Sequence, residues 1–162
     1  MRGLLLSFLG AGYLRPAPGT WGSLAAFPAA LLIHWIGGPV ALVAAIVLFG
    51  ILGTQAIGRE IGNSPDHDPG WIVIDEVVGQ WIALFVVSYG TWKMGLPALA
   101  MYPGWIAGFF FFRLFDIWKP SIVGWADRRG DALGVMLDDV FAGVFAAIAV
   151  TILGGLYHVV IL

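Results

Sequence analysis

The 162-residue sequence contains no cysteine and little charge. Without cysteine the chain has no disulfide, no thiolate nucleophile, and no zinc or iron–sulfur site built on cysteine ligands. Charged residues make up 11% of the sequence, against about 25% in typical soluble domains, and hydrophobic residues make up 60%. This composition favours a membrane protein over an unusually apolar soluble helical domain. Nothing in the net charge of −2 points to nucleic acid as a partner.

Two long stretches of the sequence carry almost no charge. Between residues 16 and 58 the only side chain that can become positively charged is His34, and from residue 140 to 162 the only one is His158. Such runs are typical of membrane-spanning helices. Glycine and proline separate five apolar segments, which cover residues 21–36, 40–57, 71–89, 96–112 and 140–162.

These segments predict an all-α bundle of about five apolar helices, embedded in a membrane. A transmembrane β-barrel would require an alternation of period two, which the segments lack. Several segments are shorter than the roughly 20 residues that a helix needs to span the hydrocarbon core, so the number of true spans stays open. No low-complexity linker divides the sequence, and we expect a single helical domain over residues 1–162.

Nearly all the charged residues fall on one side of the predicted membrane. If each apolar segment crosses once, the N-terminal stretch and the loops at 58–70 and 113–139 emerge on one side. That side collects seven of the eight basic residues and all ten acidic residues, whereas the other side has only Lys93. The positive-inside rule then places the charged side in the cytoplasm. The rule makes no demand on carboxylates, so the acidic residues require another explanation.

Residues 10–23 read GAGYLRPAPGTWGS and form a tight loop leading into a helix. Thr20 is placed to cap a helix that begins near Trp21, and the backbone N–H groups of a helix N-terminus can bind an anion. Arg15 would add charge and paired hydrogen bonds to a phosphate. The alternative is an ordinary helix cap beside a positive-inside arginine.

Adjacent carboxylates inside apolar sequence indicate a cation site. Asp75 and Glu76 stand among isoleucines and valines, four or five residues after the expected helix start, and Asp138 and Asp139 mirror them where the last apolar segment begins. Neighbouring carboxylates repel each other unless a cation or a shared proton lies between them. Mg²⁺, a hard ion that prefers oxygen ligands, fits this arrangement.

Two further charged groups have competing interpretations. Arg113, Asp116 and Lys119 can share one helix face, either as part of a phosphate site or as an ordinary row of ion pairs. The tripeptide 66–68 (Asp-His-Asp) has metal-binding residue types, but a lone loop tripeptide is more often plain solvated sequence.

Four motifs together resemble the phosphatidylglycerophosphatase A family of bacterial lipid phosphatases. The motifs are APGTWGS, IVIDEVVGQW, FRLFDIWKP and DDVFAG, and the matching stretches cover residues 10–28, 68–84 and 109–143. The resemblance implies an all-α fold, dependence on Mg²⁺, and hydrolysis of phosphatidylglycerophosphate to phosphatidylglycerol and phosphate in phospholipid biosynthesis. It also implies a multi-pass protein of the bacterial cytoplasmic (inner) membrane, acting on a lipid substrate at the cytoplasmic side.

With this resemblance, roles can be assigned as hypotheses. The expected magnesium ligands are Asp75, Glu76, Asp138 and Asp139. The expected phosphate-binding residues are Arg15, Thr20, Arg113 and Lys119. The expected catalytic residues are Asp75, Glu76, Asp116 and Asp139, with Asp116 as the base or as a further ligand. Direct attack by water and an aspartyl-phosphate intermediate both remain open, as does the oligomeric state.

Two other functions compete with this interpretation. A CDP-alcohol phosphotransferase also binds metal through aspartates on membrane helices, but its motif is met here only by Gly134 and Asp138, and Ala142 stands where its last aspartate belongs. A small ion or proton carrier could be lined by Asp75 and Glu76. A carrier would need polar residues that continue to the far side, and the far halves of the apolar segments have few.

Overall fold

The computed structural model describes the backbone of residues 2–62 and 69–161, and side chains as far as residue 156. The tripeptide 66–68, considered above as a metal site, lies outside the described residues. The helices are α1 (Arg2–Leu6), η1 (Ala11–Tyr13), α2 (Pro18–Ile61), α3 (Ile74–Lys93), η2 (Ala98–Met101), α4 (Tyr102–Trp118), α5 (Ile122–Asp127) and α6 (Ala132–Ile161). The described residues contain no strand, which confirms the all-α prediction.

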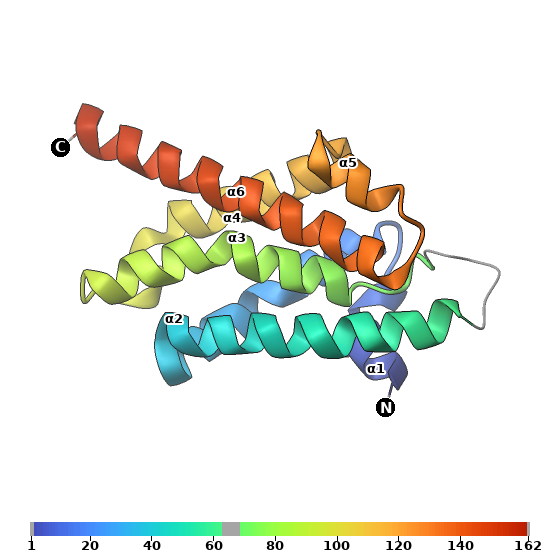
Figure 1. The fold of residues 1–162 in the computed structure, drawn as a ribbon. Coiled ribbons are helices and arrows are strands. Elements are labelled where there is room, and N and C mark those ends of the chain that lie inside the picture. Colours follow the sequence, from blue (N-terminus) through green and yellow to red (C-terminus); the bar gives the residue numbers. More distant parts are fainter. Residues whose placement is uncertain (1, 63–68, 162) are drawn as a thin grey trace.

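Helix α2 is interrupted at Gly37 and Gly38, where the chain reverses direction (Figure 1). Gly38 has φ 61° and ψ −155°, a conformation that side chains with a Cβ rarely adopt. Pro39 follows and removes a backbone hydrogen-bond donor. The tight turn expected at this Gly-Gly-Pro sequence is therefore present.

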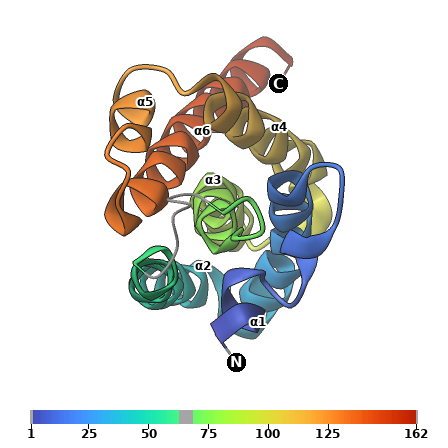
Figure 2. The same ribbon diagram turned by 90° about the vertical axis from the view of Figure 1, so that its right-hand side faces the viewer.

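Helix α3 lies at the centre of the bundle, and the other long helices surround it (Figure 2). Its buried residues lie on all sides, from Val77 and Val78 to Trp81 and Leu84. The indole Nε1–H of Trp81 donates a hydrogen bond of 2.9 Å to the carbonyl oxygen of Ala26 on α2. This contact satisfies the polar atom of a large buried side chain and anchors α3 against α2.

The starts of α3, α4 and α6 differ from the expected ones. Helix α3 begins at Ile74, so Asp75 and Glu76 lie in its first turn, not four or five residues inside it. Helix α4 covers 102–118, six residues later than the predicted segment, and has a proline near its start. Helix α6 begins at Ala132, because Asp131 accepts a 2.7 Å hydrogen bond from the Gly134 N–H and caps the first turn.

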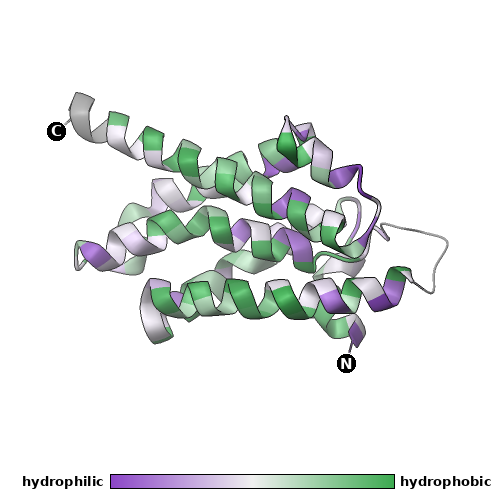
Figure 3. Ribbon diagram, viewed as in Figure 1, coloured by the Kyte–Doolittle hydropathy of each residue, from purple (hydrophilic) through white to green (hydrophobic). Residues whose placement is uncertain are grey.

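Three stretches are long and apolar enough to cross a membrane: Pro18–Ile61, Ala98–Trp118 and Ala132–Leu156. Large apolar side chains are exposed on the outside of the bundle, for example Phe110 and Ile152. Figure 3 shows that hydrophilic residues gather at the end where α3 and α6 begin, which we call the charged end. The end that contains the α2 turn and the last turn of α3 is the far end. The protein is membrane-associated.

Candidate active site

Three carboxylates meet at the charged end, and we call them the acidic trio. Asp75 and Glu76 come from the first turn of α3, and Asp139 comes from the second turn of α6. One oxygen of each lies within 4.8 Å of the others. Asp75 and Asp139 are 5% and 4% exposed, so water screens their repulsion poorly.

A close contact between α3 and α6 sets the register of the trio. A Cβ on Gly79 would lie 2.5 Å from the carbonyl oxygen of Asp139, and a Cβ on Gly143 would collide with the backbone of Gly79. The two helices start at the same end, and each has an aspartate four residues before its glycine. Four residues of helix correspond to about 6 Å along the axis, so Asp75 and Asp139 lie at the same level.

Glu76 faces the N-terminus of α2 and the side chain of Arg113. A Cβ on Gly19 would collide with Oε1 of Glu76 and lie 3.3 Å from Nη1 of Arg113. Glycine at this position therefore lets three helices approach one another. The N-terminus of α2 also contributes a partial positive charge next to the glutamate.

Arg113 and Asp116 form an ion pair within α4, which is one of the two interpretations that their spacing allowed. Both side chains are mostly buried, with 16% and 13% exposed. Arg113 attracts Glu76 and Asp139, whereas Asp116 repels them both. The structure thus brings this pair to the acidic trio.

Asp138 and Lys119 pair with each other outside the acidic trio. The Nζ of Lys119 donates a 2.8 Å hydrogen bond to Oδ2 of Asp138 and also pairs with Asp127. Partial burial opposes the charge on Lys119, but the two aspartates outweigh it and raise the pKa of the lysine above its usual value. Asp138 accepts a second hydrogen bond from the Asp139 N–H and is not a member of the trio. The structure therefore groups three of the four expected metal ligands.

Buried polar atoms without hydrogen-bond partners concentrate around the trio. Among the described residues, such side-chain atoms belong only to Glu76, Gln80, Arg113 and Asp139. Buried polar groups are paired in the great majority of cases, so six exceptions on these four residues indicate that a ligand belongs there. Gln80 was missed at the level of sequence. Its only signal there is an amide one turn after Glu76 in an otherwise apolar helix.

The trio fits a hard divalent cation. Glu76 Oε2 and Asp139 Oδ1 are buried acceptors with no hydrogen-bond donor, and a cation among the three carboxylates would satisfy both and remove their repulsion. The donor set consists of oxygen alone, which suits Mg²⁺ and does not suit softer metals.

Arg15 and Thr20 lie at the entrance to α2. The expectation that Thr20 caps this helix is wrong: the N-cap is Ala17, and its side chain makes no capping hydrogen bond. Pro18 begins the helix earlier because its fixed φ suits the first helical position and it has no N–H to satisfy. Thr20 is partly buried next to Gly19, and Arg15 is exposed in the preceding loop.

Comparison with known proteins shows which family the chain resembles. The family model for phosphatidylglycerophosphatase A matches residues 4–154. A protein of Escherichia coli with that name is 36% identical over 147 residues, covering 89% of this chain and 78% of the relative. One of Haemophilus influenzae with the same name is 35% identical over 149 residues, covering 91% and 85%. No solved structure gives a significant match.

Proposed function

The chain belongs to the phosphatidylglycerophosphatase A family, and from this premise we propose that it is a magnesium-dependent phosphatase that converts phosphatidylglycerophosphate to phosphatidylglycerol and phosphate. The observation that carries the cation requirement is the acidic trio, with two buried carboxylate oxygens that lack any donor. Asp75, Glu76 and Asp139 would hold the ion. When bound, Mg²⁺ supplies charge neutralisation for the phosphate oxygens.

The other site residues bind the substrate phosphate or support the residues that do. Arg113 has a buried Nε–H without a hydrogen-bond partner, and we assign this donor to a phosphate oxygen. Asp116 holds Arg113 through their ion pair. The N-terminus of α2 at Gly19 and Thr20 adds backbone N–H groups that suit an anion, and Arg15 contacts the headgroup from the loop outside.

Lys119 and Asp138 have a supporting role in this proposal. The lysine is held between Asp127 and Asp138, so it lends positive charge to the site while connecting α4 and α5 to α6. Phosphoryl transfer depends mainly on positioning and on neutralising charge, and these groups provide both.

The location of the site suits a lipid substrate. The trio lies at the charged end, where the apolar surface of the bundle gives way to hydrophilic residues (Figure 3). A phosphomonoester on a lipid headgroup lies at the same depth, at the membrane surface. We place this end in the cytoplasm, and the protein as a multi-pass component of the bacterial cytoplasmic membrane, because of its excess of basic residues.

Phosphate release by purified protein in detergent tests the proposal. We expect release from phosphatidylglycerophosphate with Mg²⁺ and none in EDTA. Asp75→Asn should lower kcat by about 100-fold or more, since a carboxylate that holds the ion is lost.

Two controls accompany this experiment. Glu60→Gln removes one carboxylate from the charged end outside the trio, and Lys93→Met removes the basic residue of the far end; both should retain nearly full activity. Full activity of the wild type in EDTA would refute the cation requirement. Absence of phosphate release under all conditions would refute the proposed reaction.

A further inference from the structure

Gln80 is a fully buried amide whose side chain makes no hydrogen bond to the described residues. It is 0% exposed, and neither Oε1 nor Nε2 has a partner. Whichever way the amide is turned, one of its terminal atoms is an acceptor and the other a donor. Leaving both unpaired is costly, and an apolar side chain would pack in the same space without that cost.

The position of Gln80 relates it directly to the acidic trio. Gln80 follows Glu76 by four residues, so the two side chains share one face of α3 and Gln80 lies one turn deeper in the bundle. Glu76 lies against Gly19 on α2, which begins at the same end. One turn further along α2 is Ser23, fully buried like Gln80. Gln80 and Ser23 thus lie at the same level, one turn deeper than the contact of Glu76 with Gly19, and we call this level the inner wall.

Neither terminal atom of Gln80 has a hydrogen-bond partner at this wall. The Ser23 hydroxyl already donates a 2.9 Å hydrogen bond to the carbonyl oxygen of Gly19. Glu76 Oε2 on the same face is a second buried acceptor without a donor, and it has one lone pair for the proposed cation and another for a hydrogen bond. Two acceptors one turn apart can be satisfied together by one small molecule that has two hydrogens to donate. An ionised phosphate has none, whereas water has two.

We propose that Gln80 is a positioning residue that, together with Glu76, holds the water that attacks phosphorus. This inference rests on the proposed phosphatase function. Both hydrogens of the water point to Gln80 and Glu76, which leaves a lone pair directed to the substrate. The Gln80 N–H₂ group is free to donate to a phosphate oxygen.

The reaction balances with these groups. The water oxygen forms a bond to phosphorus, and the bond between phosphorus and the glycerol oxygen breaks with its electron pair on that oxygen. One proton of the water is transferred to the glycerol oxygen. The other stays on the released phosphate.

The test compares Gln80→Met, which keeps the size and removes both polar atoms, with wild type. The matched control is Thr91→Val, another fully buried polar residue of α3, near the far end. We expect Gln80→Met to lower kcat by about 100-fold with KM unchanged. The melting temperature in detergent should be unchanged or higher, because an unpaired buried amide has been removed. Thr91→Val should retain wild-type kcat.

Gln80→Asn provides a second test, because it keeps the amide but withdraws it by one methylene group; it too should lower kcat with KM unchanged. Wild-type kcat in either variant would overturn the proposal. So would a loss of activity that only follows a lower melting temperature. If the wild-type protein itself released no phosphate, the proposed function would fail, a result distinct from any effect of Gln80.

Discussion

At the level of single residues, the site holds more negative charge than its own cations neutralise. Its carboxylates are Asp75, Glu76, Asp116, Asp138 and Asp139. Against them stand Arg113 and Lys119, and each of these is already paired with an aspartate of its own. Glu76 and Asp139 each keep a buried oxygen without a hydrogen-bond donor, in a place where repulsion between carboxylates is strong. The magnesium ion proposed above would relieve this repulsion and would also serve the chemistry.

The variant Asp139→Asn should separate stability from cation binding. In EDTA we expect it to melt at a higher temperature than wild type, because one of three repelling carboxylates becomes neutral. Mg²⁺ should stabilise the wild type by about 2.7 kcal/mol at 100 times its dissociation constant and stabilise the variant far less. Thermal unfolding in detergent, with and without Mg²⁺, measures both effects. An equal shift by Mg²⁺ in both proteins would contradict the proposed ligand role.

At the level of elements, the contact between α3 and α6 creates the site. Gly79 and Gly143 allow the two backbones to touch, and the equal spacing from each glycine back to its aspartate brings Asp75 and Asp139 together. Helices α2 and α4 then close the site around Glu76, with Gly19 and Arg113 at the contact. Lys119 connects the ends of α4 and α5 to α6.

Gly79→Ala should disrupt this contact. Its Cβ would lie 2.5 Å from both the Asp139 carbonyl oxygen and the Phe112 ring, so the helices must separate. We expect a loss of about 1–3 kcal/mol in stability and a larger loss of phosphatase activity, because Asp75 and Asp139 move apart.

Gly50→Ala is the control for this prediction. Its Cβ would meet only Val78, at 4.0 Å, and alanine is favoured over glycine in a helix by up to about 1 kcal/mol. Melting temperature and phosphate release check both variants. An active and stable Gly79→Ala protein would show that the close contact is not required.

The pairing of Lys119 with Asp138 can be tested by a double-mutant cycle. Lys119→Met should destabilise the protein by about 3 kcal/mol, because it leaves Asp138 buried and unpaired. Adding Asp138→Leu should restore much of that stability, since both charges are then gone. If Lys119 also supplies charge to the substrate, activity stays low in the double variant. Recovery of both stability and activity would limit the lysine to a structural role.

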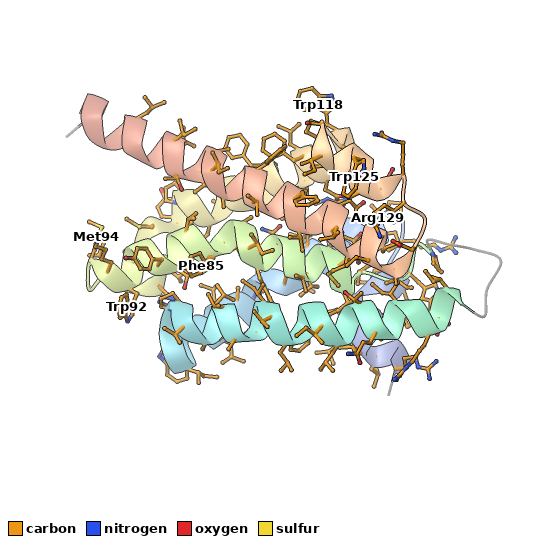
Figure 4. The ribbon with its side chains drawn as sticks, viewed as in Figure 1. Phe85, Trp92, Met94, Trp118, Trp125 and Arg129 are labelled. Carbon is orange, nitrogen blue, oxygen red and sulfur yellow. The ribbon has the colours of Figure 1, made fainter. Side chains whose placement is uncertain are left out.

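At the level of the whole molecule, the two ends of the bundle differ: the candidate active site lies at the charged end and not at the far end. Figure 4 places Trp125 and Arg129 toward the charged end and Trp92 and Met94 at the far end. Trp92 and Trp125 are 58% and 49% exposed. Exposed tryptophans toward both ends suit the two interfaces of a membrane. In the function proposed above, the site would then lie at the level where a lipid presents its headgroup.

Because the chain has no cysteine, its orientation can be mapped with introduced ones. Arg128 is exposed at the charged end and Met94 is exposed at the far end, so the variants Arg128→Cys and Met94→Cys each place one thiol on the surface of one end. In intact cells a thiol reagent that does not cross membranes should label residue 94 and leave residue 128 unlabelled until the cells are opened. The reverse labelling would place the charged end outside the cytoplasm.

The sequence by itself determined the helical class, the reversal at Gly37 and Gly38, and the separation of charges, because these depend on local composition and on apolar runs. It also identified the carboxylates and the family. Only the tertiary structure decided that Asp139, and not Asp138, joins Asp75 and Glu76. That choice depends on how α6 is rotated against α3 at Gly79, a contact between segments about sixty residues apart that no local pattern encodes. Gln80 likewise emerged only from the tertiary structure, since an unpaired amide is recognisable only when everything around it is in place.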